Sequence, residues 1–210
     1  MARYRARYRA GNCMTRARAD DYEHKKRAIL DRAVALIASK GFDHATMIDV
    51  ANACGTSKSH LYHYFPSKED LLYAIVKAHI TDQVTVLSAI VREPRPAVER
   101  FARFVGAFVR EGAKSRNHHL VLMNDIKFLP TAQREDVRKM EQALMQLMVG
   151  LLREINPEKM SAVKVQSSYA LLLFGMVIWT FTWYEKNGPI SPAELAEKIS
   201  DLFLNGFRSG

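Results

Sequence analysis

The spacing of hydrophobic and polar positions predicts helices along the whole chain. From residue 21 to residue 40, apolar side chains recur every three or four positions, and Gly41 follows where this pattern stops. The same spacing continues over residues 67–92, 97–114, 118–128, 131–155, 161–185 and 191–207. No segment shows the alternation of a strand, and no internal repeat or glycine-rich phosphate loop is visible. With the two short helices described next, the pattern predicts an all-α protein of about nine helices.

Residues 46–68 predict two short helices joined by a tight turn. Thr46 is placed to cap the first helix, with Asp49 three residues later in capping-box register. Gly55 follows where the chain must reverse, because glycine adopts a positive φ without steric cost. Ser57 is the next candidate N-cap. The segment is therefore a candidate helix-turn-helix.

The second of these short helices presents hydrogen-bond donors and no acidic group. Positions three or four apart share one face of a helix, and this face carries Lys58, Ser59, His60, Tyr62 and His63. Such a helix suits the major groove of DNA, where it meets base edges and phosphates together. The alternative is a solvated polar face on a small helical bundle.

The predicted elements divide the chain into three parts. Residues 1–20 are rich in Arg, Ala and Tyr without amphipathic spacing, which indicates a flexible arm that reaches phosphates or a minor groove, or a tail with non-specific attraction to DNA. Met14 could also be the true start, which would place residues 1–13 outside the native protein. Residues 21–68 form a three-helix DNA-binding domain, and residues 69–210 form a second helical domain that begins with a long connecting helix.

The charge balance favours an anionic partner. The formal net charge is +9, and residues 1–80 hold 14 Lys and Arg against 8 Asp and Glu. The excess therefore lies beside the predicted helix-turn-helix. The two cysteines, Cys13 and Cys54, make neither a disulfide framework nor a zinc signature, and no signal-peptide pattern is visible. These observations indicate a cytoplasmic protein.

Residues 165–184 carry no charge over a length that could span a bilayer. The run is interrupted by polar side chains at Gln166, Ser167, Ser168, Thr180 and Thr182. We therefore expect a helix buried in a bundle or a dimer interface, and no membrane segment.

Three predicted helices share residue types and spacing with a known family. The matching positions are Ile29, Leu30, Ala33, Leu36, Gly41, Phe42, Thr46, Val50, Ala51, Gly55, Ser57, Lys58, Leu61, Tyr62, His63, Tyr64, Phe65, Ser67, Lys68, Glu69, Leu71 and Leu72. This pattern resembles the TetR family of one-component transcriptional regulators. Departures occur at Met47, Cys54, Thr56, Ser59 and His60, so the operator sequence is not predictable from the resemblance.

The resemblance implies roles for individual residues on double-stranded operator DNA. Lys58, Ser59 and His60 would lie near base edges. Phosphate contacts would come from Thr46, Tyr62, His63 and Lys68, and Thr56 and Ser57 complete the candidate DNA-binding set. A homodimer through the last two helices of each subunit, with contacts such as Ala170, Gly175 and Phe203, would read a near-palindromic operator.

The second domain is rich in bulky apolar side chains, which suits a deformable pocket for a hydrophobic effector. The candidates are Phe104, Phe108, His119, Met123, Met148, Tyr169, Trp179 and Trp183. Each could equally be a core residue. Residues 183–195 are similar to family members that sense acyl-CoA thioesters or other hydrophobic catabolites, so an acyl-CoA is one candidate effector.

No catalytic motif, cofactor fingerprint or metal-ligand spacing appears in the sequence. We therefore predict no enzyme activity, no cofactor and no metal. The expected mechanism is a repressor released from DNA when an effector binds and moves the long connecting helix. A helix-turn-helix protein without a small-molecule effector, controlled by a protein partner or acting as an activator, remains the alternative.

Overall fold

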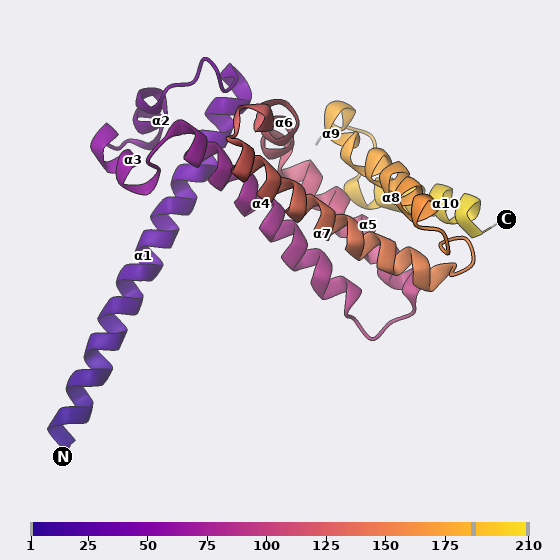
Figure 1. Ribbon diagram of the computed structural model, residues 1–210, viewed down its shortest axis with the longest axis horizontal. Coiled ribbons are helices and arrows are strands. Elements are labelled where there is room, and N and C mark those ends of the chain that lie inside the picture. The colour runs from indigo at the N-terminus through magenta and orange to yellow at the C-terminus, as the bar shows by residue number, and fades with distance from the viewer. Residues whose placement is uncertain (1, 186–187, 209–210) are drawn as a thin grey trace. The chain divides into compact units, whose positions relative to one another are not determined.

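The computed structural model describes the backbone of residues 2–185 and 188–208, and the side chains from residue 20 onward except residues 181 and 207–208. In that part of the chain every regular element is helical (Figure 1), which confirms the predicted all-α class. The elements are α1 Ala2–Lys40, α2 Met47–Cys54, α3 Lys58–Tyr64, α4 Lys68–Val91, α5 Ala97–Lys114, α6 Arg116–Asp125, the 3-10 helix η1 Ile126–Phe128, α7 Thr131–Ile155, α8 Val163–Ile178, α9 Thr180–Trp183 and α10 Pro192–Arg208.

Three predicted helices differ from the structure, one of them the helix over 118–128, which is α6 from Arg116 to Asp125 followed by the 3-10 helix η1. α1 begins at Ala2 rather than near residue 21, because the Ala- and Arg-rich segment has high intrinsic helix propensity even without an apolar face. The predicted helix over 161–185 divides into α8 and α9. At this break Thr180 Oγ1 donates to the carbonyl of Val177 at 2.7 Å, a local bond that competes with the helical pattern.

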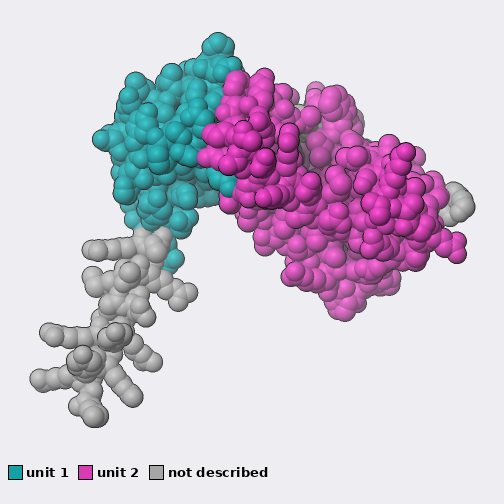
Figure 2. All heavy atoms as spheres, viewed as in Figure 1, with its two compact units in different colours: residues 1–75 teal, residues 76–210 magenta. Residues whose placement is uncertain are grey.

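The chain forms two compact units, residues 1–75 and 76–210 (Figure 2). The division lies inside α4, because the buried residues Leu71, Leu72 and Ile75 belong to the first unit. α4 therefore begins in the first unit and continues into the second as one unbroken helix. This covalent connection is the long linking helix that the sequence predicted.

The first unit packs α1, α2 and α3 around a small core. Ile29, Ala33 and Ile37 of α1 are buried at the predicted helical spacing, and Leu61 of α3 is fully buried. The loop between α1 and α2 is fixed by Lys68 at the start of α4. Its ammonium donates to the carbonyls of Phe42 at 2.8 Å and Ala45 at 3.0 Å. Only one side of α3, the side of Leu61, packs against this core. The other side is exposed to solvent.

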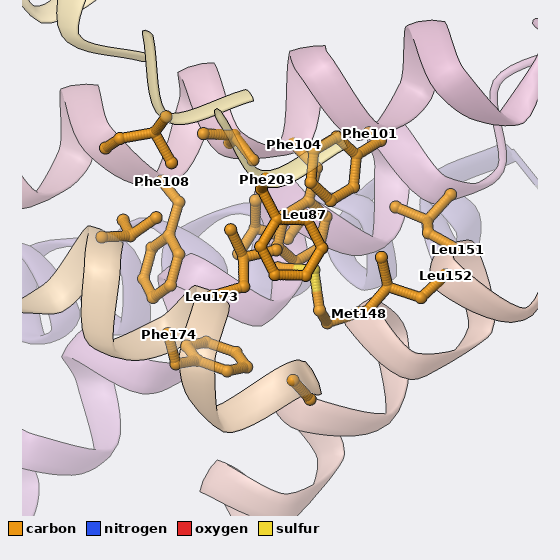
Figure 3. Close-up of a cluster of buried hydrophobic side chains, with 14 of the residues drawn as sticks. Leu87, Phe101, Phe104, Phe108, Met148, Leu151, Leu152, Leu173, Phe174 and Phe203 are labelled. Atoms are coloured by element: carbon orange, nitrogen blue, oxygen red, sulfur yellow. The ribbon is translucent and has the colours of Figure 1, made fainter. Parts of the chain in front are cut away.

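The core of the second unit is built around α5. Phe101 stacks on Phe203 of α10 with ring centroids 5.7 Å apart, and Phe108 meets Phe174 of α8 edge-on at 5.3 Å. Figure 3 shows these rings together with Phe104 and with leucine and methionine side chains of α7. α5 is therefore the central helix, covered by α7, α8 and α10.

One described helix, α4, is long and apolar enough to cross a membrane by length and composition alone. A core helix of a soluble protein passes the same test, and Leu87 and Ile90 of α4 are part of the buried core. α8 contains much of the uncharged run over 165–184, but it spans only Val163–Ile178 and is shorter than the roughly 20 residues a membrane helix needs.

Candidate nucleic-acid interface and internal cavity

Helix α2 begins with the capping box that the sequence predicted. Asp49 N donates to Thr46 Oγ1 at 3.1 Å, and Thr46 N donates to the Asp49 carboxylate at 3.0 Å. The hydrogen bond from the Thr46 backbone, with a smaller contribution from Lys40 at 3.4 Å, holds the pKa of Asp49 below its usual value. These contacts satisfy two otherwise unpaired backbone donors and fix where α2 starts.

The Thr46→Ala variant is expected to lower the free energy of unfolding by about 1 kcal/mol, because the end of α2 loses its side-chain cap. Urea denaturation of the full chain measures this change. Thr85→Ala, at an exposed position within α4, is the matched control and should change stability by less than about 0.5 kcal/mol. Equal losses in the two variants would show that the cap is not what stabilises α2.

The turn into α3 depends on Gly55 and Ser57. Gly55 has φ 63° and ψ 35°, the left-handed conformation that a side chain disfavours. Ser57 caps α3 by accepting a hydrogen bond from His60 N at 3.1 Å. Thr56 Oγ1 lies 2.8 Å from His60 Nδ1, so the turn also orients the His60 ring. The predicted turn and cap are both confirmed.

The structure brings the predicted polar face of α3 together on the solvent side. Five side chains are exposed on this α3 face, namely Lys58, Ser59, His60, Tyr62 and His63. Beneath them, Leu61 and Phe65 are buried and anchor the helix. The Lys58 ammonium lies 5.7 Å from the centre of the Tyr62 ring.

An aromatic contact between α1 and α3, which the sequence analysis did not predict, supports the side of α3 opposite the exposed face. Tyr64 of α3 stacks on Tyr22 of α1 with centroids 4.8 Å apart. The rings of His60 and His63 meet Tyr64 edge-on at 5.2 and 5.8 Å. The spacing of His60 and Tyr64 along α3 signalled part of this cluster, but nothing in the sequence signalled its pairing with Tyr22.

Lys68 has a structural role in addition to any contact with DNA. We predicted a phosphate contact, whereas two of the three ammonium protons are engaged by the carbonyls of Phe42 and Ala45. The same ammonium lies 4.2 Å from the centre of the Phe42 ring. Phosphate binding by Lys68 would use the remaining proton, so its substitution would disturb the loop before α2 as well.

The second unit contains a cavity of about 410 Å³ with mostly apolar walls from α4, α5, α6, α7 and α8 and a contribution from η1. Three of the eight predicted effector-binding residues line it, namely Phe108, His119 and Met123. Its volume lies within the range of about 300–1,000 Å³ that is typical of small-molecule sites.

The other five candidates for effector binding do not line this cavity. Phe104 and Met148 are fully buried in the core, and Tyr169 packs against Phe203 with centroids 6.3 Å apart. Trp179 and Trp183 are 59% and 53% exposed. Large apolar residues at helical spacing are equally suited to a core, a cavity wall and an exposed interface, so the sequence pattern did not separate them.

Two polar residues of the cavity wall, Gln83 and Glu141, were missed. Gln83 occupies the same face of α4 as the buried Ile80 and Leu87. Glu141 occupies the face of α7 that carries the buried Val137, Leu144 and Met148. A polar residue at an apolar position of a helical pattern is the signal that could have identified both.

Burial controls the ionisation of the cavity wall. His119 is 4% exposed, and its burial, with a smaller effect of His118, lowers its pKa to about 4. Burial also raises the pKa of the Glu141 carboxyl, partly offset by Arg138. His119 is therefore neutral near pH 7. The His79 ring contacts both His118 and His119, but no group of the described residues is arranged to hold a metal ion.

His119 should make stability depend on pH. The unfolded chain binds a proton at this residue near pH 6.5, whereas the folded protein does so near pH 4. The unfolded state holds more protons between these values, so stability is full above pH 6.5 and falls as the pH falls toward 4. We expect a loss of about 2 kcal/mol between pH 7 and pH 4.5.

Urea denaturation across this pH range measures the effect. His119→Gln should flatten the dependence, while His24→Gln, at an exposed position of α1, should leave it unchanged. The same slope in His119→Gln as in the parent protein would contradict this account.

An exposed stripe follows one face of α8 and continues to Trp179, the residue directly after the helix. Positions 168, 172, 175 and 179 share this face and are all exposed, with Leu172 and Trp179 as its large side chains. Leu202 of the neighbouring α10 is also exposed. Of the dimer contacts predicted from sequence, Gly175 lies on this stripe, but Ala170 and Phe203 are buried in the core of their own subunit.

A capped helix-turn-helix with an exposed donor-rich second helix, joined to a separate helical unit, defines a helix-turn-helix DNA-binding protein. Residues 29–75 match the family described as bacterial regulatory proteins, tetR family, and residues 94–207 match the tetracyclin repressor-like C-terminal domain. The chain belongs to the TetR family. It is a DNA-binding transcriptional regulator and not an enzyme.

Known proteins resemble the chain over most of its length. A crystal structure of a TetR-family transcriptional regulator from Bordetella parapertussis 12822 is 31% identical, covers 88% of this chain and 96% of its own, and has a TM-score of 0.81. The fatty acid metabolism regulator protein of Bacillus subtilis is 21% identical, over 86% of this chain and 94% of its own. The structure of AibR in complex with isovaleryl coenzyme A and operator DNA is 20% identical, with a TM-score of 0.75 over 85% of this chain and 97% of its own.

Proposed function

We propose that this protein is a cytoplasmic repressor that binds a near-palindromic operator as a homodimer and leaves it when a hydrophobic small molecule occupies the cavity of the second unit. The observation that carries the DNA-binding part is the exposed face of α3, which the Gly55 turn and the Ser57 cap hold in a fixed orientation.

Each side chain of this face has a role suited to its chemistry. Lys58, Ser59 and His60 lie at the N-terminal end of α3 and would contact base edges, where residues of a recognition helix read sequence. Tyr62 and His63 would donate to phosphates on either side. Thr46 at the start of α2 and Thr56 in the turn before α3 would contact the DNA backbone beside α3.

The exposed stripe of α8 supports a homodimer. Leu172, Trp179 and Leu202 present large apolar surfaces on two adjacent helices, and such surfaces on a soluble protein mark interaction sites. A second copy of the chain is the occupant we propose, because two identical recognition helices would match a palindromic operator. Leu172→Asp should convert the dimer to a monomer in sedimentation analysis, while Val163→Asp, at an exposed position outside the stripe, should not.

The cavity supports an effector site, and α4 offers a route from it to the DNA-binding unit. Ile80 and Gln83 of α4 line the cavity, and the same helix begins in the first unit at Lys68. An effector that binds a different position of α4 more tightly would shift the protein to a conformation with lower DNA affinity. The names of the B. subtilis fatty acid regulator and of the isovaleryl coenzyme A complex make hydrophobic acyl compounds, acyl-CoA thioesters included, the first candidates.

The experiment combines two measurements on the same protein, its melting temperature and its binding to DNA. A panel of acyl-CoAs and hydrophobic acids, esters and ketones is added to the protein alone and to its DNA complex. A true effector should raise the melting temperature of the free protein and release the DNA. If no compound does both, the effector part of the proposal is wrong, and regulation by a protein partner or by concentration takes its place.

A further inference from the structure

The cavity of the second unit has mostly apolar walls that contain three polar side chains, His119, Gln83 and Glu141. Gln83 projects from the apolar face of α4 and Glu141 from that of α7, where a leucine would fit the surrounding pattern. Polar groups at such positions reduce stability unless they have hydrogen-bond partners. Of the two, Gln83 has a buried side-chain atom without a hydrogen-bond partner, which a ligand could supply.

Gln83 places a buried hydrogen-bond donor in the wall of the cavity. Its side chain is 5% exposed, and its Nε2 is buried without a hydrogen-bond partner. A buried N–H group without an acceptor loses its bonds to water and gains nothing in return. Rotation of the Gln83 amide toward a ligand oxygen in the cavity would supply that acceptor.

The charge of the cavity wall disfavours an anion. Among the described residues, neither Lys nor Arg lines the cavity. The acidic residue of the wall is Glu141, and His119 is held neutral by its burial. Arg138, whose charge acts on Glu141, is exposed and is not part of the wall, and the Lys127 ammonium lies 5.0 Å from the centre of the Phe128 ring. A carboxylate inside this cavity would be desolvated without a counter-charge.

We propose that the cavity selects an effector whose buried part is uncharged and carries a carbonyl acceptor, as in a ketone, ester or thioester, with Gln83 Nε2 as the hydrogen-bond donor and Glu141 as the group that excludes carboxylates. This inference rests on the proposed function, in which the cavity holds the effector. The cavity would therefore bind neutral derivatives of hydrophobic acids more tightly than the free acids themselves.

The test uses the full chain and ligands matched in chain length. Methyl ketones, methyl esters, carboxylates and plain hydrocarbons are compared by thermal shift and by direct titration near pH 7. We expect ketones and esters to bind about tenfold more tightly than hydrocarbons, the effect of one hydrogen bond to a buried donor. Carboxylates should bind at least about tenfold more weakly than the matched esters.

Two variants assign the preference to particular residues. Gln83→Leu should raise the melting temperature of the ligand-free protein and abolish the preference for ketone over hydrocarbon. If Gln83→Leu does not fold, Gln83→Met, which has an unbranched side chain, replaces it in the same test. Glu141→Gln should strengthen carboxylate binding about tenfold. Gln146→Leu and Glu135→Gln, at exposed positions of α7, are the matched controls and should change neither preference.

Several results would overturn the inference. These are equal binding of carboxylate and ester by the parent protein, an unchanged ketone preference in Gln83→Leu, or no binding by any neutral probe. DNA release, measured in parallel, tests the proposed function separately. Neutral probes that bind with the expected preference but leave DNA bound would support the cavity chemistry and overturn the effector function.

Discussion

Replacing Phe104 with alanine is expected to lower the free energy of unfolding by about 3–5 kcal/mol. Phe104 is fully buried on α5, in contact with the ring of Phe108 at 6.4 Å, and α5 is the central helix of the second unit. Removing its ring deletes buried apolar contacts and leaves a cavity that the surrounding helices fill only in part. Because Phe104 does not line the cavity of the second unit, the loss should appear as instability rather than as a change in ligand preference.

Urea denaturation of the full chain, followed by circular dichroism, measures this loss. Val163→Ala is the control, since Val163 is 76% exposed, and it should change stability by less than about 0.5 kcal/mol. A Phe104→Ala protein as stable as the parent would mean that α5 is not the centre of the core.

The double variant Lys58→Ala/His60→Ala is expected to lose sequence-specific DNA binding. Each good contact with a base edge contributes about 1–3 kcal/mol of discrimination, so loss of two should weaken specific binding by about thirtyfold or more. The fold should be retained, because both side chains are exposed while Leu61 and Phe65 anchor α3 from below.

Fluorescence anisotropy with specific and random DNA distinguishes this result from a general loss of charge. Lys139→Ala removes one positive charge from an exposed position of α7 and should leave specific binding within about threefold of the parent, since a single surface charge acts only through screened attraction. If the double variant keeps its preference for specific DNA, the exposed face of α3 is not the reading surface.

The local features of the first unit could be predicted because their causes lie within a few residues of one another. Thr46 and Asp49 cap α2, Gly55 adopts the left-handed turn, and Ser57 caps α3. Each depends on the chemistry of one side chain and of the backbone three residues away. The periodicity of Ile29, Ala33 and Ile37 likewise predicted the buried face of α1.

Features that depend on distant partners could not be predicted in the same way. The bonds of Lys68 join it to the loop that follows α1, more than twenty residues earlier in the chain. The difference between Phe104 in the core and Phe108 in the cavity wall depends on which helices pack on α5. The exposure of Trp179 could not be predicted either, because its helical spacing fits a buried face, whereas the structure places it on the exposed stripe.

The cavity of the second unit shows what a polar residue in an apolar helical pattern can indicate. Gln83 and Glu141 interrupt apolar faces of α4 and α7, and both are found in the cavity wall. Local rules are most often broken at functional sites, where stability is exchanged for binding.

The most direct test of the central claim, that α3 reads a symmetric operator, is selection of bound sequences from a random DNA pool, followed by salt-titrated binding to the enriched sequence. The account predicts a near-palindrome whose half-sites lie about 34 Å apart or a multiple of that distance. It also predicts a preference of at least ~10³ over random DNA and affinity that falls steeply with salt. Selection that enriches no sequence, with equal affinity for all DNAs, would contradict it.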